Sequence, residues 1–145
     1  MYVHDGPIVS AHLGGYRVPR GDSVRQTRLP LGDLASWTGS TSGGAGGDLF
    51  RPALLRDPTV TFIGGYDGRA IVAGAVLNRT EDVIGISNVF TTRGDLDSTW
   101  RGCLVYVDCA APGAGIVGYE SGDELAAAHR QGSESVAPLR IWLRR

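Results

Sequence analysis

The sequence has 145 residues, the size of one ordinary domain, and its 14 basic against 15 acidic residues leave a net charge of −1. This balance argues against a nucleic-acid surface and a polybasic membrane anchor, so we expect a small molecule or a protein as partner. All the basic residues are arginines, and the absence of lysine excludes Schiff-base chemistry and a lysine nucleophile.

Arginine in place of lysine, together with abundant glycine and alanine, is typical of a GC-rich bacterial genome. The N-terminus lacks the basic and apolar regions of a signal peptide, and no stretch approaches the roughly 18 apolar residues of a membrane span. These features predict a soluble, cytoplasmic protein. We expect a single domain over residues 1–145.

Residues 1–58 give few signals of regular structure. Short apolar pieces alternate with turns, and the run GSTSGGAGG at residues 39–47 is typical of a flexible loop. The readable core of the domain therefore begins near residue 59 and extends to residue 144.

Three antiparallel strands are predicted from residue 59 onward. The apolar segments at 59–66 and 69–80 flank Asp67-Gly68, a dipeptide that suits a tight hairpin turn. A second polar turn leads to a third strand at 83–92, in which Gly85 indicates a bulge or a close backbone approach. The three strands form a meander.

A helix is predicted over residues 98–111, where apolar side chains recur at helical spacing, with Asp97 or Ser98 as its cap and Pro112 as its end. The apolar run at 114–120 then predicts a buried strand. The order strand, helix, strand implies a right-handed crossover and a parallel pair. Cys103 and Cys109 point in different directions on this helix and are interpreted as single buried thiols, and no histidine has metal-ligand spacing.

Residues 121–132 predict a second helix, in which Ser121 and Glu124 have the spacing of a reciprocal capping box and Gly132 is a C-terminal stop. The chain finishes with a strand at 136–145. The predicted fold class is α+β: a mixed sheet made of an antiparallel meander, a strand-helix-strand crossover, a second helix and a final strand.

This order of elements, with the segments AGAVLNRTEDVIGISNVF and GIVGYESGDELAAAHRQGSESVAPLRIWL, resembles the GNAT family of acetyl-CoA-dependent N-acetyltransferases, in a compact actinobacterial form. The resemblance covers residues 59–144. It implies that the strands on either side of the crossover helix splay apart. The pantetheine arm of acetyl-CoA then lies between them and pairs with the backbone of the earlier strand.

Carried onto this sequence, the resemblance implies that the cofactor lies against the earlier strand and the turn after it. Asn88, Val89 and Phe90 line the pantetheine arm, mostly through backbone groups. The cofactor-binding residues at the turn and the helix start are Thr91, Arg93, Gly94 and Ser98.

In this family the diphosphate is bound by a loop with the motif [QR]-x-x-G-x-[GA]. The corresponding segment of this sequence does not match the motif in either of its two possible alignments. Asp95 and Asp97 also bring negative charge to the place where a diphosphate belongs. We interpret these two aspartates as helix-capping residues. Arg93 has two open interpretations, a phosphate ligand or a solvated loop charge.

The later strand of the implied cleft ends at Tyr119 and Glu120, which alternation sends to opposite faces of the sheet. Glu120 is a candidate general base, with an ordinary surface carboxylate as the alternative. Tyr119 is a candidate acid, because Ala128 stands where the family carries a tyrosine in the following helix. His129 is a third candidate acid or base, with a half-exposed helical histidine as the alternative.

The resemblance implies transfer of an acetyl group from acetyl-CoA to a primary amine of a small molecule, by direct attack and without a metal. Positioning and backbone polarisation of the thioester carbonyl can supply much of such catalysis. We favour this acyltransferase over a non-catalytic or truncated GNAT-like binding domain, which the altered loop and Ala128 support. A homodimer is left open.

Overall fold

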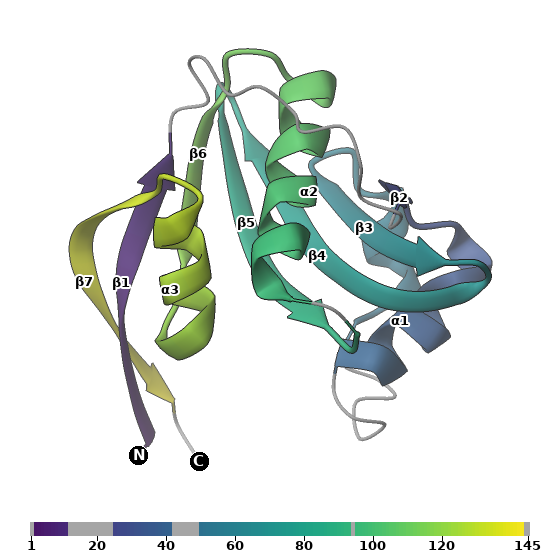
Figure 1. Cartoon of the computed structure of the whole chain (residues 1–145), viewed down its shortest axis with the longest axis horizontal. Helices are drawn as coiled ribbons and strands as arrows, with labels where there is room; N and C mark the ends of the chain where they lie inside the picture. Colours follow the sequence, from purple (N-terminus) through teal and green to yellow (C-terminus); the bar gives the residue numbers. More distant parts are fainter. Residues whose placement is uncertain (1, 12–24, 42–49, 94, 144–145) are drawn as a thin grey trace.

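The computed structural model describes residues 2–11, 25–41, 50–93 and 95–143, and it arranges them in one mixed sheet flanked by helices (Figure 1). The strand order is β2-β3-β4-β5-β6-β1-β7. The strands are β1 Tyr2–Ala11, β2 Arg25–Arg28, β3 Val60–Asp67, β4 Ala70–Thr80, β5 Val83–Thr91, β6 Gly115–Tyr119 and β7 Glu134–Leu143. The helices are α1 Leu34–Thr41, α2 Leu96–Ala110 and α3 Gly122–Arg130, with 3-10 turns η1 Leu31–Asp33 and η2 Pro52–Arg56.

The predicted meander is formed by β3, β4 and β5, which pair antiparallel in sequence order. The first hairpin turns at Gly68, whose positive φ of 60° is the conformation that this tight turn requires. The bulge lies at a different place from the one predicted. Gly85 pairs regularly with Asn78, whereas Asn88 and Val89 together oppose a single residue of β4, and Asn88 has a φ of 51°.

The predicted crossover is confirmed, because α2 connects β5 to β6 and these strands pair in parallel. The cap of α2 is Asp95 and not Asp97 or Ser98, the two positions predicted from the start of the helix. The Asp95 carboxylate accepts the backbone N–H of Ser98 at 2.6 Å, in agreement with the interpretation of Asp95 as a capping residue, and Asp97 lies within the first turn. Both cysteines are free thiols, as predicted, and Cys103 is buried. The prediction was wrong for the burial of Cys109, which is exposed. The buried face of α2 carries Thr99, Trp100, Cys103, Leu104 and Val107.

Helix α3 starts and ends where predicted, but the capping box is absent. Ser121 occupies the N-cap position without a side-chain hydrogen bond to the helix. The next residue, Gly122, has a φ of +56°, so the first turn does not have the regular backbone that a reciprocal box needs. Gly132 follows the helix with a φ of +89°, which fits its role as a stop.

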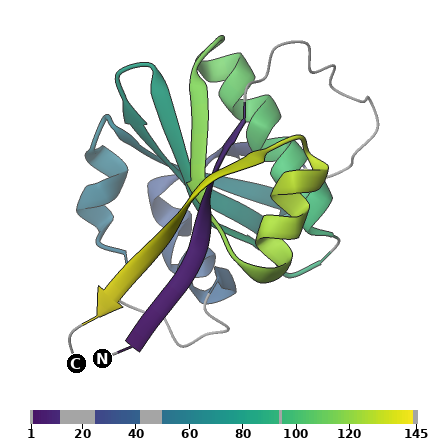
Figure 2. The ribbon, with the colours of Figure 1, turned by 90° about the vertical axis from the view of Figure 1, so that its left-hand side faces the viewer.

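The sequence did not reveal β1, which lies between β6 and β7 and pairs antiparallel with both. Figure 2 shows β1 and β7 side by side, with the start of β1 next to the end of β7. Pro7 and Pro138 face each other across this pair. Because proline has no N–H, they must form a non-hydrogen-bonded pair, which explains how two prolines fit inside neighbouring strands.

The two faces of the sheet carry separate apolar cores. The core under α2 and α3 is built around Trp100, Leu104, Val107 and Ile86, and the core under α1 is built around Trp37 and Phe62. Both tryptophans are buried. Residues 39–41 of the predicted loop at 39–47 are instead the end of α1, and residues 42–47 lie outside the described part.

Candidate functional site

The parallel pair of β5 and β6 is short. Its last aligned residues are Ile86 and Gly118, and the bulge at Asn88 follows directly on β5. The strands therefore diverge beyond this point (Figure 1). Over residues 87–91, the edge of β5 that faces away from β4 has no partner among the described strands. Its backbone N–H and C=O groups are available to an extended ligand.

The side chains of this segment of β5 are engaged elsewhere. Val89 packs in the core under α2, and Phe90 packs in the core on the opposite face, where its ring meets Trp37 edge-on at 5.2 Å. Asn88 is exposed. The Thr91 hydroxyl donates to the carbonyl of Val72 at 3.2 Å. Any contact of Val89 or Phe90 with a ligand in the diverging region therefore uses backbone atoms.

Glu120 directly follows β6 and is buried, with 7% of its surface exposed. It shares a face with Ile116 and Gly118, which are also buried, whereas Tyr119 lies on the opposite face and is half-buried. Within the described part of the chain, Glu120 Oε1 has no hydrogen-bond partner. Burial, and secondarily the charge of Glu124, raises the pKa of Glu120 to about 7.

The surroundings of Glu120 include the buried face of α2. Burial raises the pKa of the Cys103 thiol to about 12, and the nearby Glu120 carboxylate adds to this rise. This thiol is therefore not a nucleophile near neutral pH. One turn earlier on α2, the indole N–H of Trp100 is also buried without a partner among the described residues. The sequence did not predict this unpartnered donor, because its burial results from the packing of the folded chain.

The other two candidate acids or bases, Tyr119 and His129, are not hydrogen-bond partners of Glu120 among the described residues. His129 is exposed on α3, and its Nε2 lies 2.9 Å from the hydroxyl of Ser135 on β7. Ala128, beside it, is fully buried in the core beneath α3. The exposed position of His129 agrees with the alternative interpretation of a surface histidine.

The turn between β5 and α2 is held by acidic side chains. Asp95 Oδ1 accepts from the Ser98 backbone N–H, and Asp95 Oδ2 accepts from the Ser98 hydroxyl at 3.3 Å. The backbone hydrogen bond from Ser98 is the main cause that lowers the pKa of Asp95. The Asp95 carboxylate therefore already accepts a hydrogen bond from one of the backbone N–H groups at the N-terminus of α2. Gly94, a predicted cofactor residue, lies outside the described residues.

Two arginines contact this region. Arg93 is exposed, and its Nη1 lies 3.8 Å from Asp67 Oδ2 in the β3–β4 hairpin, a loose surface pair. Arg130, at the end of α3, donates from Nε to both carboxylate oxygens of Asp97 at 2.9 Å. This second pair connects the start of α2 to the end of α3. No local sequence pattern indicates this ion pair, since the two residues are 33 positions apart.

No group of three or more His, Cys, Asp or Glu side chains within the described ranges is arranged to hold a metal ion. Over the same ranges, none of the helices combines the length and the apolar character needed to cross a membrane.

Solved structures with the same arrangement of elements were found. A GCN5-related N-acetyltransferase from Kribbella flavida matches with a TM-score of 0.66 at 17% identity, covering 94% of this chain and 57% of that protein. The chain has the GNAT fold. It spans less than two thirds of the length of the Kribbella protein. No protein-family model matches the sequence, and no curated protein matches it.

Two other GNAT-fold matches are close to this chain in length. A ribosomal-protein-alanine N-acetyltransferase from Brucella melitensis has a TM-score of 0.62 at 11% identity, covering 85% of this chain and 99% of that protein. A protein from Clostridium acetobutylicum described as a predicted acetyltransferase and solved with acetyl-CoA has a TM-score of 0.58 at 13% identity, covering 84% of this chain and 95% of that protein. At these identities the likeness establishes the fold.

Proposed function

We propose that the protein is an acetyl-CoA-dependent N-acetyltransferase that acts on a primary amine of a small molecule, with Glu120 as the general base. One observation carries the proposal: a buried carboxyl group with an unpartnered oxygen and a pKa of about 7, next to the point where β5 and β6 diverge. The GNAT fold, in which one size-matched neighbour was solved with acetyl-CoA, supports it.

The chemistry asked of Glu120 is the removal of one proton from an ammonium group. A base whose pKa lies near the working pH combines a useful ionised fraction with enough basicity to accept the proton. The neutral amine then attacks the thioester carbonyl. The C–N bond forms and the C–S bond breaks. The proton that the attacking nitrogen then releases passes through water to the departing thiolate of coenzyme A.

The residues at the proposed site fit the pantetheine arm of acetyl-CoA better than its diphosphate. The open edge of β5 over residues 87–91 offers backbone groups to the pantetheine arm. At the diphosphate end, the Asp95 carboxylate holds the Ser98 amide, and Arg93 is the exposed cation beside it. We expect the backbone of β5 to dominate binding, with Arg93 offsetting part of the negative charge of Asp95.

The same Asp95 cap favours a second candidate function, a GNAT-like domain that binds a ligand or a partner without catalysis. An N-terminus of α2 that is capped by Asp95 and connected to α3 through Asp97 is stable without a phosphate. In this case acetyl transfer is absent, and Glu120 is a buried carboxyl group with no chemical role.

The test is an acetylation assay over a panel of primary amines, with thiol release read by a chromogenic reagent. Cys109 is exposed and contributes a background, so all proteins carry Cys109→Ser. We expect Glu120→Gln to lower kcat by about 10²- to 10⁴-fold, the usual contribution of a general base. Asp123→Asn, which removes an exposed carboxylate in the first turn of α3, is the matched control. Equal activity of Glu120→Gln and the parent protein contradicts the assignment.

A further inference from the structure

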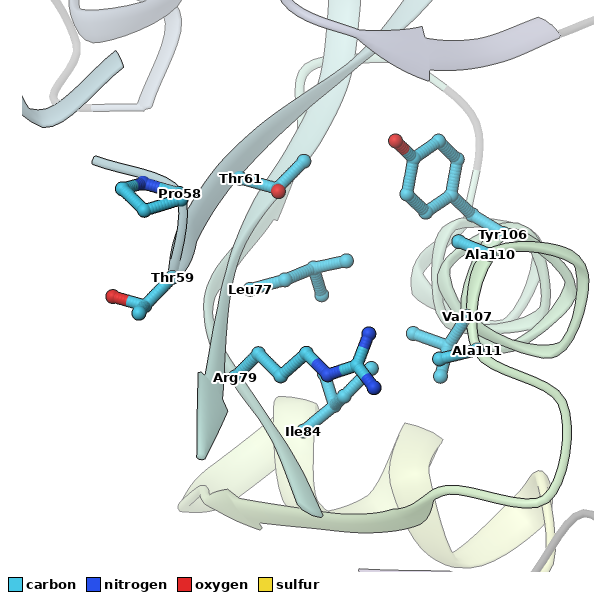
Figure 3. Close-up of a pocket in the computed structure, with 10 residues that line it drawn as sticks. All are labelled: Pro58, Thr59, Thr61, Leu77, Arg79, Ile84, Tyr106, Val107, Ala110 and Ala111. Carbon is cyan, nitrogen blue, oxygen red and sulfur yellow. The ribbon is translucent and has the colours of Figure 1, made fainter. Parts of the chain in front are cut away.

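A pocket lies between the sheet and the C-terminal half of α2, at the end of β5 away from Glu120. It has about 140 Å³ of free space (Figure 3). Ile84, near the start of β5, lines it, whereas the diverging segment of β5 begins after Ile86. This pocket is therefore separate from the region proposed to bind acetyl-CoA.

The inner surface of the pocket is apolar. Leu77, Ile84 and Val107 are buried side chains that line it, and Ala110 and Ala111 add two methyl groups from the end of α2 (Figure 3). A cavity of about 150 Å³ with aliphatic and aromatic walls holds one benzene molecule. The free space in the pocket is therefore large enough for one six-membered ring.

Polar groups of three residues border this apolar surface. The Arg79 side chain extends from β4 toward α2, and Tyr106 and Thr61 lie at the other end of the pocket (Figure 3). Arg79 Nε donates to the carbonyl of Glu81 at 3.2 Å, and its guanidinium forms no ion pair with a described carboxylate. The hydroxyls of Tyr106 and Thr61 have no hydrogen-bond partner within the described ranges.

We propose that this pocket binds a small carboxylate with a compact apolar body, of the class of monocyclic aromatic acids. The planar guanidinium of Arg79 can bind a carboxylate with two parallel hydrogen bonds, and the ring replaces water over Leu77 and Val107. The C-terminal end of α2 carries partial negative charge, so Arg79 is the group that makes the pocket favourable for an anion. This inference is independent of the acetyltransferase proposal.

The experiment is a titration of benzoate into the full chain, followed by ¹H–¹⁵N NMR. We expect saturable binding with a Kd below about 1 mM and shifts centred on Tyr106, Ala110 and Arg79. Benzyl alcohol, which keeps the ring and lacks the charge, is expected to bind at least about tenfold more weakly.

Two variants and one control make the test specific. Arg79→Gln is expected to weaken benzoate at least about tenfold, and Ala110→Leu, which fills the space, is expected to abolish binding. Arg69→Gln, an exposed arginine beside the β3–β4 turn, is the matched control and should leave Kd unchanged. Far-UV circular dichroism checks that each variant is folded.

The proposal is overturned by three outcomes: no saturable binding at about 10 mM benzoate, shifts that map away from the pocket, or equal affinity in Arg79→Gln and the parent protein. Because the readout is benzoate binding, none of these outcomes affects the acetyltransferase proposal. Loss of acetyl transfer likewise leaves the benzoate titration unchanged.

Discussion

Replacing Glu120 by glutamine should make the protein more stable at alkaline pH and should flatten part of its pH dependence. Burial, with a smaller contribution from Glu124, raises the pKa of Glu120 from 4.5 to about 7 in the folded protein. A folded-state pKa above the unfolded value means that the native state binds the proton more tightly. The associated stability is fully present below pH 4.5 and is lost as the pH rises to about 7.

The magnitude follows from the difference between the two pKa values. A difference of about 2.5 pH units corresponds to about 3 kcal/mol between the two protonation states. Glutamine keeps the size of the side chain and cannot ionise, so the variant avoids this loss. At pH 8 we expect the Glu120→Gln protein to be more stable by about 3 kcal/mol, or roughly 6–12 °C in Tm. Below pH 4.5 the two proteins should be about equally stable.

The assay is urea unfolding of the parent protein, Glu120→Gln and the control Asp123→Asn at intervals from pH 4 to pH 8. The informative quantity is the difference in unfolding free energy between parent and variant at each pH, because the other titrating groups are common to both proteins. A difference that stays constant across this range refutes the reasoning that Glu120 is buried and titrates near neutrality.

Three further predictions concern the elements around the site. Asp95→Ala should cost about 1 kcal/mol of stability through loss of the α2 cap and should tighten acetyl-CoA binding; weaker binding in calorimetry would contradict our view of Asp95 as a competitor of the diphosphate. Ala128→Tyr, which introduces the family's tyrosine at a fully buried position, should destabilise by at least about 1–3 kcal/mol in urea unfolding; unchanged stability would show that the position has room. Deleting residues 1–11 should expose the amides of β7 to hydrogen exchange, because β1 is the partner that joins β7 to the described sheet; retained protection would refute the pairing.

The parts of the fold that the sequence predicted correctly depend on local signals. The β3–β4 hairpin has its turn dipeptide at Gly68, and the two ends of α3 coincide with Ser121 and Gly132. The position of β1 depends instead on pairing with segments more than 100 residues away. Pro7 also argues against a strand unless Pro138 is known to face it.

The features of the candidate site that the sequence predicted also depend on local signals. Alternation along β6 correctly separated Tyr119 from Glu120, but the raised pKa of Glu120 requires the burial that α2 and α3 create. The sequence indicated Asp95 as a capping residue but did not distinguish it from Asp97 and Ser98, because all three are good capping residues within four positions. The ion pair of Asp97 with Arg130 joins two helix ends and has no local pattern.

The most direct test of the central claim is calorimetric titration of acetyl-CoA into the purified protein. We expect acetyl-CoA to bind saturably with a Kd below about 1 mM. A pantetheine fragment that lacks the diphosphate should bind with a similar Kd, because the β5 backbone dominates the interaction. An absence of heat at millimolar acetyl-CoA would contradict the acetyltransferase proposal.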